Sequence, residues 1–202
     1  LATEACDNPD MQAMFNLQER LQEKIEQSKK LNAPKDLEAF KIMIARTIGY
    51  GKLAAFYPIL EDYMKDLSPA VVKQAILSAG SSQAPCFIKT LLSFLPNKST
   101  RSAARKALAR YEPAELLPIL EDVSRAPETK TDLLIQLPAL AETMETQQAV
   151  DYLFALVQQE DPIVKMEALE SLHKIKARFP HLTIGWKRLI PIVTGDIDLY
   201  KD

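Results

Sequence analysis

The chain has 202 residues, of which 47% are apolar, and its formal net charge is −2. This apolar content excludes a wholly disordered chain, and the near-neutral charge gives no electrostatic reason to expect nucleic acid, whose binding favours a strongly basic surface. No apolar run approaches the roughly 20 residues that a membrane-spanning helix needs. Only five glycines occur and strictly alternating apolar segments are missing, so the sequence predicts helices throughout.

The N-terminal part predicts a short disordered lead, residues 1–9, and then two helices of different character. The lead has no initiator methionine and no secretory-signal pattern, so we expect this chain to be a piece of a longer polypeptide. A helix over 36–48 is apolar nearly all round and belongs inside a stack, and Gly49–Gly51 is expected to end it. The helix before it, over 10–31, has a single apolar stripe typical of an end cap: Met14, Leu17, Leu21 and Ile25.

Four further helix pairs are predicted: 53–66 with 69–79, 84–95 with 98–111, 114–125 with 128–142, and 146–159 with 162–178. Gly80 is expected to stop the helix before it, because glycine just past a helix end is the favoured cap. Pro138 should kink or shorten its helix. The helix over 98–111 has the unbroken spacing of a buried face: Thr100, Ala103, Ala104, Ala107, Leu108 and Tyr111.

The helix pairs repeat a sequence pattern. The segment Tyr57–Asp62 returns almost unchanged as Leu117–Asp122. Independently, a template of five positions recurs four times toward the N-terminus at intervals of about 29 to 35 residues, the length of a two-helix repeat: Pro162, Val164, Lys165, Ala168 and Leu172. One helix pair cannot cover its own apolar face, so neighbouring pairs must stack.

The template segment Asp161–Leu172 resembles the second helix of HEAT repeats, with its Asp-Pro start, Val and Lys, then Ala and Leu at fixed spacing. The likeness covers roughly residues 35–178. It implies an all-α fold: a right-handed, armadillo-like α-α superhelix of about five helix pairs over 10–178, closed by a capping helix and tail over 179–202. HEAT motifs are degenerate, so this likeness bears on the fold and not on the function.

Residues with catalytic chemistry are few and scattered. The two histidines, His173 and His181, have no serine or cysteine beside them in a nucleophile-type turn. Cys6 and Cys86 lack the spacing of a metal site or a disulfide framework, and we expect reduced thiols.

Two carboxylate pairs, Glu61/Asp62 and Glu121/Asp122, repeat in register. They are interpreted as solvated or inter-repeat pairing residues, with a ligand or metal site as the weaker alternative. We therefore predict no catalytic, cofactor or metal site, and a protein that is not an enzyme.

Basic residues gather in the helix over 98–111. Arg101 shares a template position with Lys130 and Lys165, and in HEAT-like stacks such a cation can bridge adjacent repeats. The alternative is recognition of a phosphate or an acidic peptide. Because the cluster is confined to one helix, general nucleic-acid binding is not expected. The candidate partner-binding residues, of which the second and third lie off the apolar stripe, are Arg101, Arg105, Lys106 and Arg110.

The stretch Ala168–Ile184 is similar to the end of the HEAT segment in bacterial proteins whose N-terminal half resembles ATP/ADP-antiporter-type membrane carriers. In that family a helix runs into a turn like Arg178–Leu182, and an acidic-Tyr stretch like Asp196–Tyr200 follows. The resemblance implies a cytoplasmic domain, tethered to the inner membrane through a part absent from this chain and carrying no transport residues.

Two hypotheses follow. The first is a non-catalytic binding or regulatory scaffold that engages a protein segment or another domain of its own polypeptide, without nucleic acid and without inserting this segment into a membrane. The second is an enzyme or polyanion-binding protein of the same architecture, such as the HEAT-like bilin lyases or alkylpurine DNA glycosylases. A continuous positive groove containing the four candidate residues would favour polyanion binding.

Overall fold

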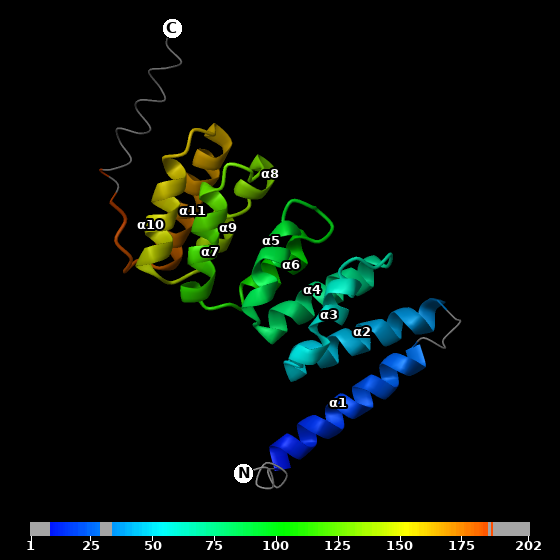
Figure 1. The fold of residues 1–202 in the computed structure, drawn as a ribbon. Coiled ribbons are helices and arrows are strands. Elements are labelled where there is room, and N and C mark those ends of the chain that lie inside the picture. Colours follow the sequence, from blue (N-terminus) through cyan, green and yellow to red (C-terminus); the bar gives the residue numbers. More distant parts are fainter. Residues whose placement is uncertain (1–8, 29–33, 186, 188–202) are drawn as a thin grey trace. The chain divides into compact units, whose positions relative to one another are not determined.

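Helices make up all the regular secondary structure in the described part of the chain, where no strand occurs (Figure 1). The computed structural model describes residues 9–28, 34–185 and 187. The predicted all-α class is therefore confirmed. The predicted disordered lead before Pro9, and the predicted capping helix and tail beyond Lys187, lie outside the described residues.

The chain forms two compact units. The first comprises residues 1–87 and 102–110, and the second comprises residues 88–101 and 111–202. Each unit buries its own set of large apolar side chains. Fully buried examples in the first unit are Ile44, Ile48, Leu60, Ile76 and Phe87, and in the second unit Leu92, Leu116, Leu153, Leu156 and Leu172.

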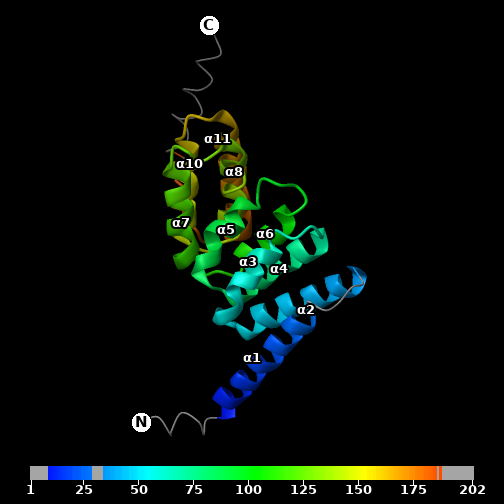
Figure 2. The same ribbon diagram turned by 45° about the vertical axis from the view of Figure 1, so that its right-hand side comes forward.

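The first unit starts with two long helices, α1 (Pro9–Ser28) and α2 (Pro34–Gly51), which contact each other. It continues with the 3-10 turn η2 (Ala54–Phe56), α3 (Tyr57–Tyr63), α4 (Pro69–Ser82), the 3-10 turn η3 (Pro85–Phe87) and most of α6 (Arg101–Leu108). Helices α2 and α4 pack along each other, as Figures 1 and 2 both show. Short helices such as α3 therefore gain their stability from this packing rather than from their own length.

The second unit contains the remaining helices. They are α5 (Ile88–Ser93), α7 (Pro113–Arg125), α8 (Thr131–Leu134), α9 (Pro138–Ala141), α10 (Gln147–Val157) and α11 (Pro162–Arg178). The bounds of α11 match the prediction. The helix predicted over 128–142 is instead two short ones, because Pro138 cannot continue a helix and begins α9.

Polar caps explain where the longer helices begin. The Ser68 side chain accepts a hydrogen bond from the backbone N–H of Val71 and caps α4. The Asp161 carboxylate likewise accepts from the N–H groups of Ile163 and Val164 at the start of α11. Both caps are followed by proline at the first helical position, where its missing N–H costs nothing.

The segment Gly49–Gly51 ends α2 as predicted, at Gly51, but Gly49 itself lies inside the helix, and Gly80, which was predicted to stop α4, lies inside α4. Helix α2 runs on through Gly49, and α4 runs on through Gly80. A Cβ atom at Gly49 would lie 2.5 Å from the Ser78 carbonyl oxygen, and one at Gly80 would lie 2.5 Å from the Ala107 Cα. These glycines therefore allow α2 to approach α4, and α4 to approach α6, at backbone distance.

The residues that directly follow α2 and α4 are not glycines but have left-handed backbones. Lys52, just after α2, has φ 49°, and Gln83, which caps α4, has φ 54°. Both lie in the left-handed region that most residues avoid. A 3-10 turn follows each of them, η2 in one case and η3 in the other. The same succession of left-handed residue, 3-10 turn and first helix thus recurs along the chain.

Side-chain hydrogen bonds recur at the spacing of one helix pair. In the first unit Ser68 donates to Glu38, 30 residues away, and Arg46 donates to Gln74, 28 residues away. In the second unit Thr131 donates to Asp161, Ser171 to Glu142 and Gln159 to the Ser124 carbonyl, over 30, 29 and 35 residues. Each such bond joins two segments that are about one predicted repeat length apart in the sequence.

The predicted buried stripe before and along α6 is confirmed. Ala104, Ala107 and Leu108 are fully buried, and Thr100, Ala103 and Tyr111 expose at most 7% of their surface. In the second unit the template residue Ala168 is fully buried as well. The end-cap stripe of α1 is less complete, since Leu21 is buried while Leu17 is 37% exposed.

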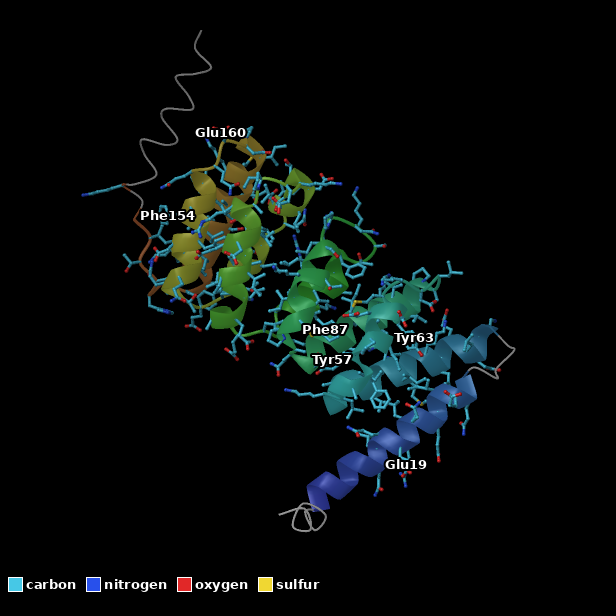
Figure 3. All side chains as sticks on the ribbon, viewed as in Figure 1. Glu19, Tyr57, Tyr63, Phe87, Phe154 and Glu160 are labelled. Carbon is cyan, nitrogen blue, oxygen red and sulfur yellow. The ribbon has the colours of Figure 1, made fainter. Side chains whose placement is uncertain are left out.

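Aromatic contacts add to the core: the rings of Tyr57 and Phe87 meet edge to face with centroids 5.0 Å apart (Figure 3).

A part-buried ion pair links α2 to the turn before α4. The Lys41 ammonium donates to the Asp66 carboxylate, whose other oxygen accepts from the Ser68 N–H. Burial alone would raise the pKa of Asp66, but these hydrogen bonds and the Lys41 charge outweigh it and lower the pKa below its ordinary value of 3.8. Burial, with the nearby Asp66 and Asp62 charges, raises the pKa of Tyr63 to about 12.

The glycine contacts predict that replacing these glycines by alanine destabilises the fold, whereas helix propensity alone predicts that it stabilises the fold. We expect Gly49→Ala and Gly80→Ala each to lower the free energy of unfolding by about 2 kcal/mol, because the added methyl group forces the helix backbones apart. Urea unfolding followed by circular dichroism measures this. Gly51→Ala is the matched control, since its Cβ would meet only side-chain atoms of Leu53 and Leu17. Stabilisation by about 1 kcal/mol, as propensity alone predicts, would contradict the close approach.

The Lys41–Asp66 ion pair predicts that the free energy of unfolding depends on pH. Because folding lowers the pKa of Asp66, the pair stabilises the fold fully above the unfolded value near 3.8 and loses its effect as pH falls through the lower folded value. We expect Asp66→Asn to lower the free energy of unfolding by about 1–2 kcal/mol near neutral pH and by much less at about pH 2.5. Asp62→Asn, at an exposed carboxylate on α3, serves as the control. An equal loss at both pH values would count against the pair.

Candidate functional site

Acidic residues are missing from most of the segments that carry the second helices of the first unit. Between Leu67 and Tyr111 there is no Asp or Glu, and between Ala39 and Leu60 there is none either. The first of these stretches contains seven cations: Lys73, Lys89, Lys98, Arg101, Arg105, Lys106 and Arg110. Helices α4 and α6 therefore have no carboxylate of their own to neutralise their lysines and arginines.

Five exposed cations of the first unit form what we name the basic face. They lie on or just after α4 and the two helices that approach it, α2 and α6: Arg46 and Lys52 for α2, Lys73 for α4, and Lys106 and Arg110 for α6. All five side chains belong to residues in the exposed class. The unit as a whole thus presents positive charge on consecutive second helices.

Hydrogen bonds place Arg46 and Arg110 beside the same side of α4. On α4, Gln74 and Ser81 are about two turns apart and lie on the same side of the helix, about a quarter turn from Lys73. Arg110 reaches this side, since its Nη1 donates to Ser81 Oγ at 3.0 Å. Lys106 lies one turn before Arg110. On the same side of α4, Arg46 Nε donates to Oε1 of Gln74 at 3.0 Å.

A polar ladder joins the C-terminal ends of these helices. Lys52 Nζ donates to Gln83 Oε1 at 2.9 Å, and Gln83 Nε2 donates to the Arg110 carbonyl at 2.8 Å. Arg46 and Lys52 are therefore held by side-chain amide oxygens and Arg110 by a hydroxyl, groups that carry no formal charge. Such partners orient a cation and leave its charge available to an anion. Cations near a helix C-terminus are also favoured by the helix dipole.

The four candidate partner-binding residues predicted from the sequence have different environments in the structure. Lys106 and Arg110 are exposed on the basic face, and Arg105 is half-buried. Arg101 is held elsewhere: its Nε donates to the Leu95 carbonyl and its Nη2 to the Pro96 carbonyl, both at 2.8 Å. Its contacts are thus with the loop that precedes its own helix, and not with an adjacent repeat as we expected. That Lys106 and Arg110 bind a partner stays a prediction.

The other candidate groups lie apart from one another. His173 is exposed, and His181 Nε2 is 3.5 Å from Glu145 Oε1 at the surface. Glu121 pairs with Arg125 one turn later on α7. No group of three or more His, Cys, Asp or Glu residues in the described ranges could hold a metal ion.

Two open hollows lie in the second unit. One, of about 400 Å³, is lined by α5, the end of α7 and α8, with Lys89, Asp122 and Glu128 at its edge and Leu92 and Leu133 at its base. The other, of about 380 Å³, lies beside α10 and includes Phe154 and Gly185. Figure 3 shows Phe154 on α10. Neither hollow brings together groups that form a recognisable catalytic constellation.

None of the helices within the described residues is both long enough and apolar enough to cross a membrane.

No protein-family model matches this chain, and no match is found among curated protein sequences.

Three residues of the basic face, Arg46, Lys52 and Lys73, were not predicted. They lie in three different segments, and the sequence signal that finds them is the absence of acidic residues around them. A search for cations within a single helix cannot detect a surface that is assembled from three helices about one repeat length apart.

The Arg101 contacts predict a structural role for this residue. Arg101→Met leaves the Leu95 and Pro96 carbonyls without their donors, and we expect it to lower the free energy of unfolding by about 1–3 kcal/mol. Lys106→Met removes the same charge from an exposed position, and its expected effect lies within about 0.5 kcal/mol. Urea unfolding of both variants measures the difference. Equal stability of the two would show that the Arg101 contacts contribute nothing.

Proposed function

We propose that this chain is a non-catalytic scaffold of HEAT-like helix-pair repeats that binds a protein segment or another domain of its own polypeptide. The observation that carries the proposal is the basic face. Its five cations are exposed and lie on or just after α2, α4 and α6, and uncharged partners orient three of them, Arg46, Lys52 and Arg110. A fixed, one-signed surface of this kind is suited to recognition and steering.

The repeat architecture supports the same proposal. Hydrogen bonds at the spacing of one helix pair, and the succession of left-handed residue, 3-10 turn and helix, fit a right-handed α-α superhelix. In such a stack each second helix presents its outer side next to that of its neighbour. An extended ligand then meets several helices in turn, which is how solenoid proteins bind.

A more specific proposal concerns where in the cell the scaffold lies and to what it is attached. The likeness of Ala168–Ile184 to the HEAT segment of bacterial antiporter-like proteins supports a cytoplasmic regulatory domain, tethered to the inner membrane through another part of its polypeptide. The partner of the basic face would then be a segment of that same polypeptide.

A photo-crosslinking amino acid at Tyr50 tests the scaffold proposal. Tyr50 is 72% exposed and lies one turn after Arg46 on the same side of α2. In cells that make the natural gene product, we expect a crosslink from this position to one defined protein segment. The crosslink should disappear when Lys73→Glu and Lys106→Glu are added, because the cations that recruit the partner are reversed.

Met166 on α11 provides the matched control position. It is 55% exposed but lies in the second unit. The same crosslinker there should not yield the Tyr50 product. Crosslinking from Tyr50 that equals the Met166 background, or that survives the charge reversals, would contradict the scaffold proposal.

A further inference from the structure

We infer that Lys52 and Arg110 form an oxyanion site at the last turn of α4, where they bind one carboxylate or phosphate group carried by the partner segment. The inference rests on the proposed function, and it adds the residues and the chemistry that anchor the partner. It is drawn from the contacts that bring the two cations to this turn and from their lack of an anionic partner.

The contacts at the last turn of α4 bring Lys52 and Arg110 together from two other segments. Helix α4 ends at Ser82, and Gln83 caps it. Lys52 Nζ donates to Gln83 Oε1 at 2.9 Å, and Arg110 Nη1 donates to Ser81 Oγ at 3.0 Å. Gln83 Nε2 also donates to the Arg110 carbonyl oxygen at 2.8 Å. Two cations that lie far apart in the sequence are therefore anchored to the same turn.

The close approach of α4 and α6 fixes the position of this turn. Gly80 lies directly before Ser81, and a Cβ atom at Gly80 would lie 2.5 Å from the Ala107 Cα. Ala107 lies about one turn before Arg110. The hydrogen bond between Arg110 and Ser81 is therefore made beside the point where the two backbones meet. Two packed backbones hold the site in place.

Neither cation is neutralised by a carboxylate. Elsewhere in the protein, cations such as Lys41 and Arg125 are paired with carboxylates. No ion pair of Lys52 or Arg110 occurs within the described part of the chain, and this holds also for Glu112, the carboxylate nearest to Arg110 in sequence. An ammonium has three N–H donors and a guanidinium has five. The contacts with α4 use one of each, so donors remain for an anion.

The carboxylates of α2 lie at the other end of that helix. Asp36 and Glu38 belong to its first two turns, whereas Lys52 follows its last residue. A helix rises about 1.5 Å per residue, so about 20 Å of helix separates Glu38 from Lys52. Glu38 also accepts a hydrogen bond from the Ser68 hydroxyl. Because physiological salt screens exposed charges beyond about 8 Å, these carboxylates do not repel an anion at Lys52.

The two cations suit an anion with several oxygens. The planar guanidinium of Arg110 matches the oxygens of a carboxylate or phosphate, and the ammonium of Lys52 on its flexible stem can close on the same group. A phosphate ester carries a charge of about −1.5 to −2 near neutral pH, which two cations balance. The C-terminal end of a helix carries only about half a negative charge. We therefore expect phosphate to bind more tightly than carboxylate.

Three pentapeptides that differ only in their central residue test the site. The central residue is phosphoserine, glutamate or serine, and alanines flank it between blocked ends. Each peptide is titrated into the isotope-labelled full chain at constant ionic strength. Two-dimensional NMR follows the side-chain amide of Gln83 and the backbone N–H of Arg110. Inorganic phosphate and a single-stranded oligodeoxynucleotide are titrated in the same way, to distinguish free phosphate and nucleic acid from a protein segment.

We expect saturable shifts of both signals with the phosphoserine and glutamate peptides, and none with the serine peptide. The phosphoserine peptide should bind at least about five-fold more tightly than the glutamate peptide, because its charge is larger. Equal binding of these two peptides would support the site and assign a carboxylate as the anchor.

Variants connect the binding to the two cations. Lys52→Met/Arg110→Met should lose the shifts. Lys98→Met/Lys130→Met removes the same charge from exposed lysines of the second unit and should keep them, and circular dichroism checks that both variants are folded. Gln83→Glu is a second test that retains both cations. Its carboxylate competes with the ligand for Lys52, so binding should weaken by at least about five-fold.

The inference is overturned if neither acidic peptide gives saturable shifts, if the serine peptide binds equally, or if Lys52→Met/Arg110→Met binds as the unaltered chain does. Tighter binding of inorganic phosphate or of the oligodeoxynucleotide than of the phosphoserine peptide also overturns it, because the site would then not select a protein segment. If the peptides fail but the Tyr50 crosslink is found, the oxyanion site is wrong and the scaffold proposal stands. If the crosslink fails while the peptides bind, the scaffold proposal is wrong and the site stands.

Discussion

The contact of glycine with a neighbouring backbone is the constraint on which the first unit depends. Gly49 meets Ser78, and Gly80 meets Ala107, at distances that no Cβ atom would permit. Helix α4 is therefore held at close range on both flanks. Only at this range do the polar side chains at the helix ends reach one another, so that Lys52 and Gln83 form their ladder. Packing and polar contacts thus follow from the same two residues.

The close packing of α4 against its neighbours also determines where the positive charges of the first unit lie. Cations on three different helices become neighbours, and uncharged partners such as Gln74 and Ser81 hold two of them in place. Some acidic residues of this unit, in contrast, form ion pairs within the fold. Asp66, for example, is paired with Lys41 in a part-buried position that links α2 to the turn before α4. The paired charges thus hold parts of the unit together, while the exposed cations are the groups on which the proposed function rests.

Much of the fold could be predicted from the sequence because its signals are local. Proline and a polar cap mark the start of α11, and the spacing of apolar residues identifies the buried side of α6. The end of α4, and the close approach of another helix at Gly49, could not be predicted this way. A glycine that stops a helix and a glycine that admits another helix look alike in one sequence, and left-handed residues such as Lys52 and Gln83 have no composition signal. The site was found only in part, because Lys106 and Arg110 lie near each other in sequence while Arg46 and Lys73 come from other repeats.

The two glycine contacts also limit how the length of the chain can vary. One residue inserted into α4 ahead of Ser78 would turn the rest of the helix by about 100°, since a helix has 3.6 residues per turn. Ser78 would then leave Gly49, and Gly80 would leave Ala107. The loop between α7 and α8 has no such contact and can absorb a change of length. Deletions and insertions in related chains should therefore collect in the second unit's loops and avoid the segment from Gly49 to Ala107.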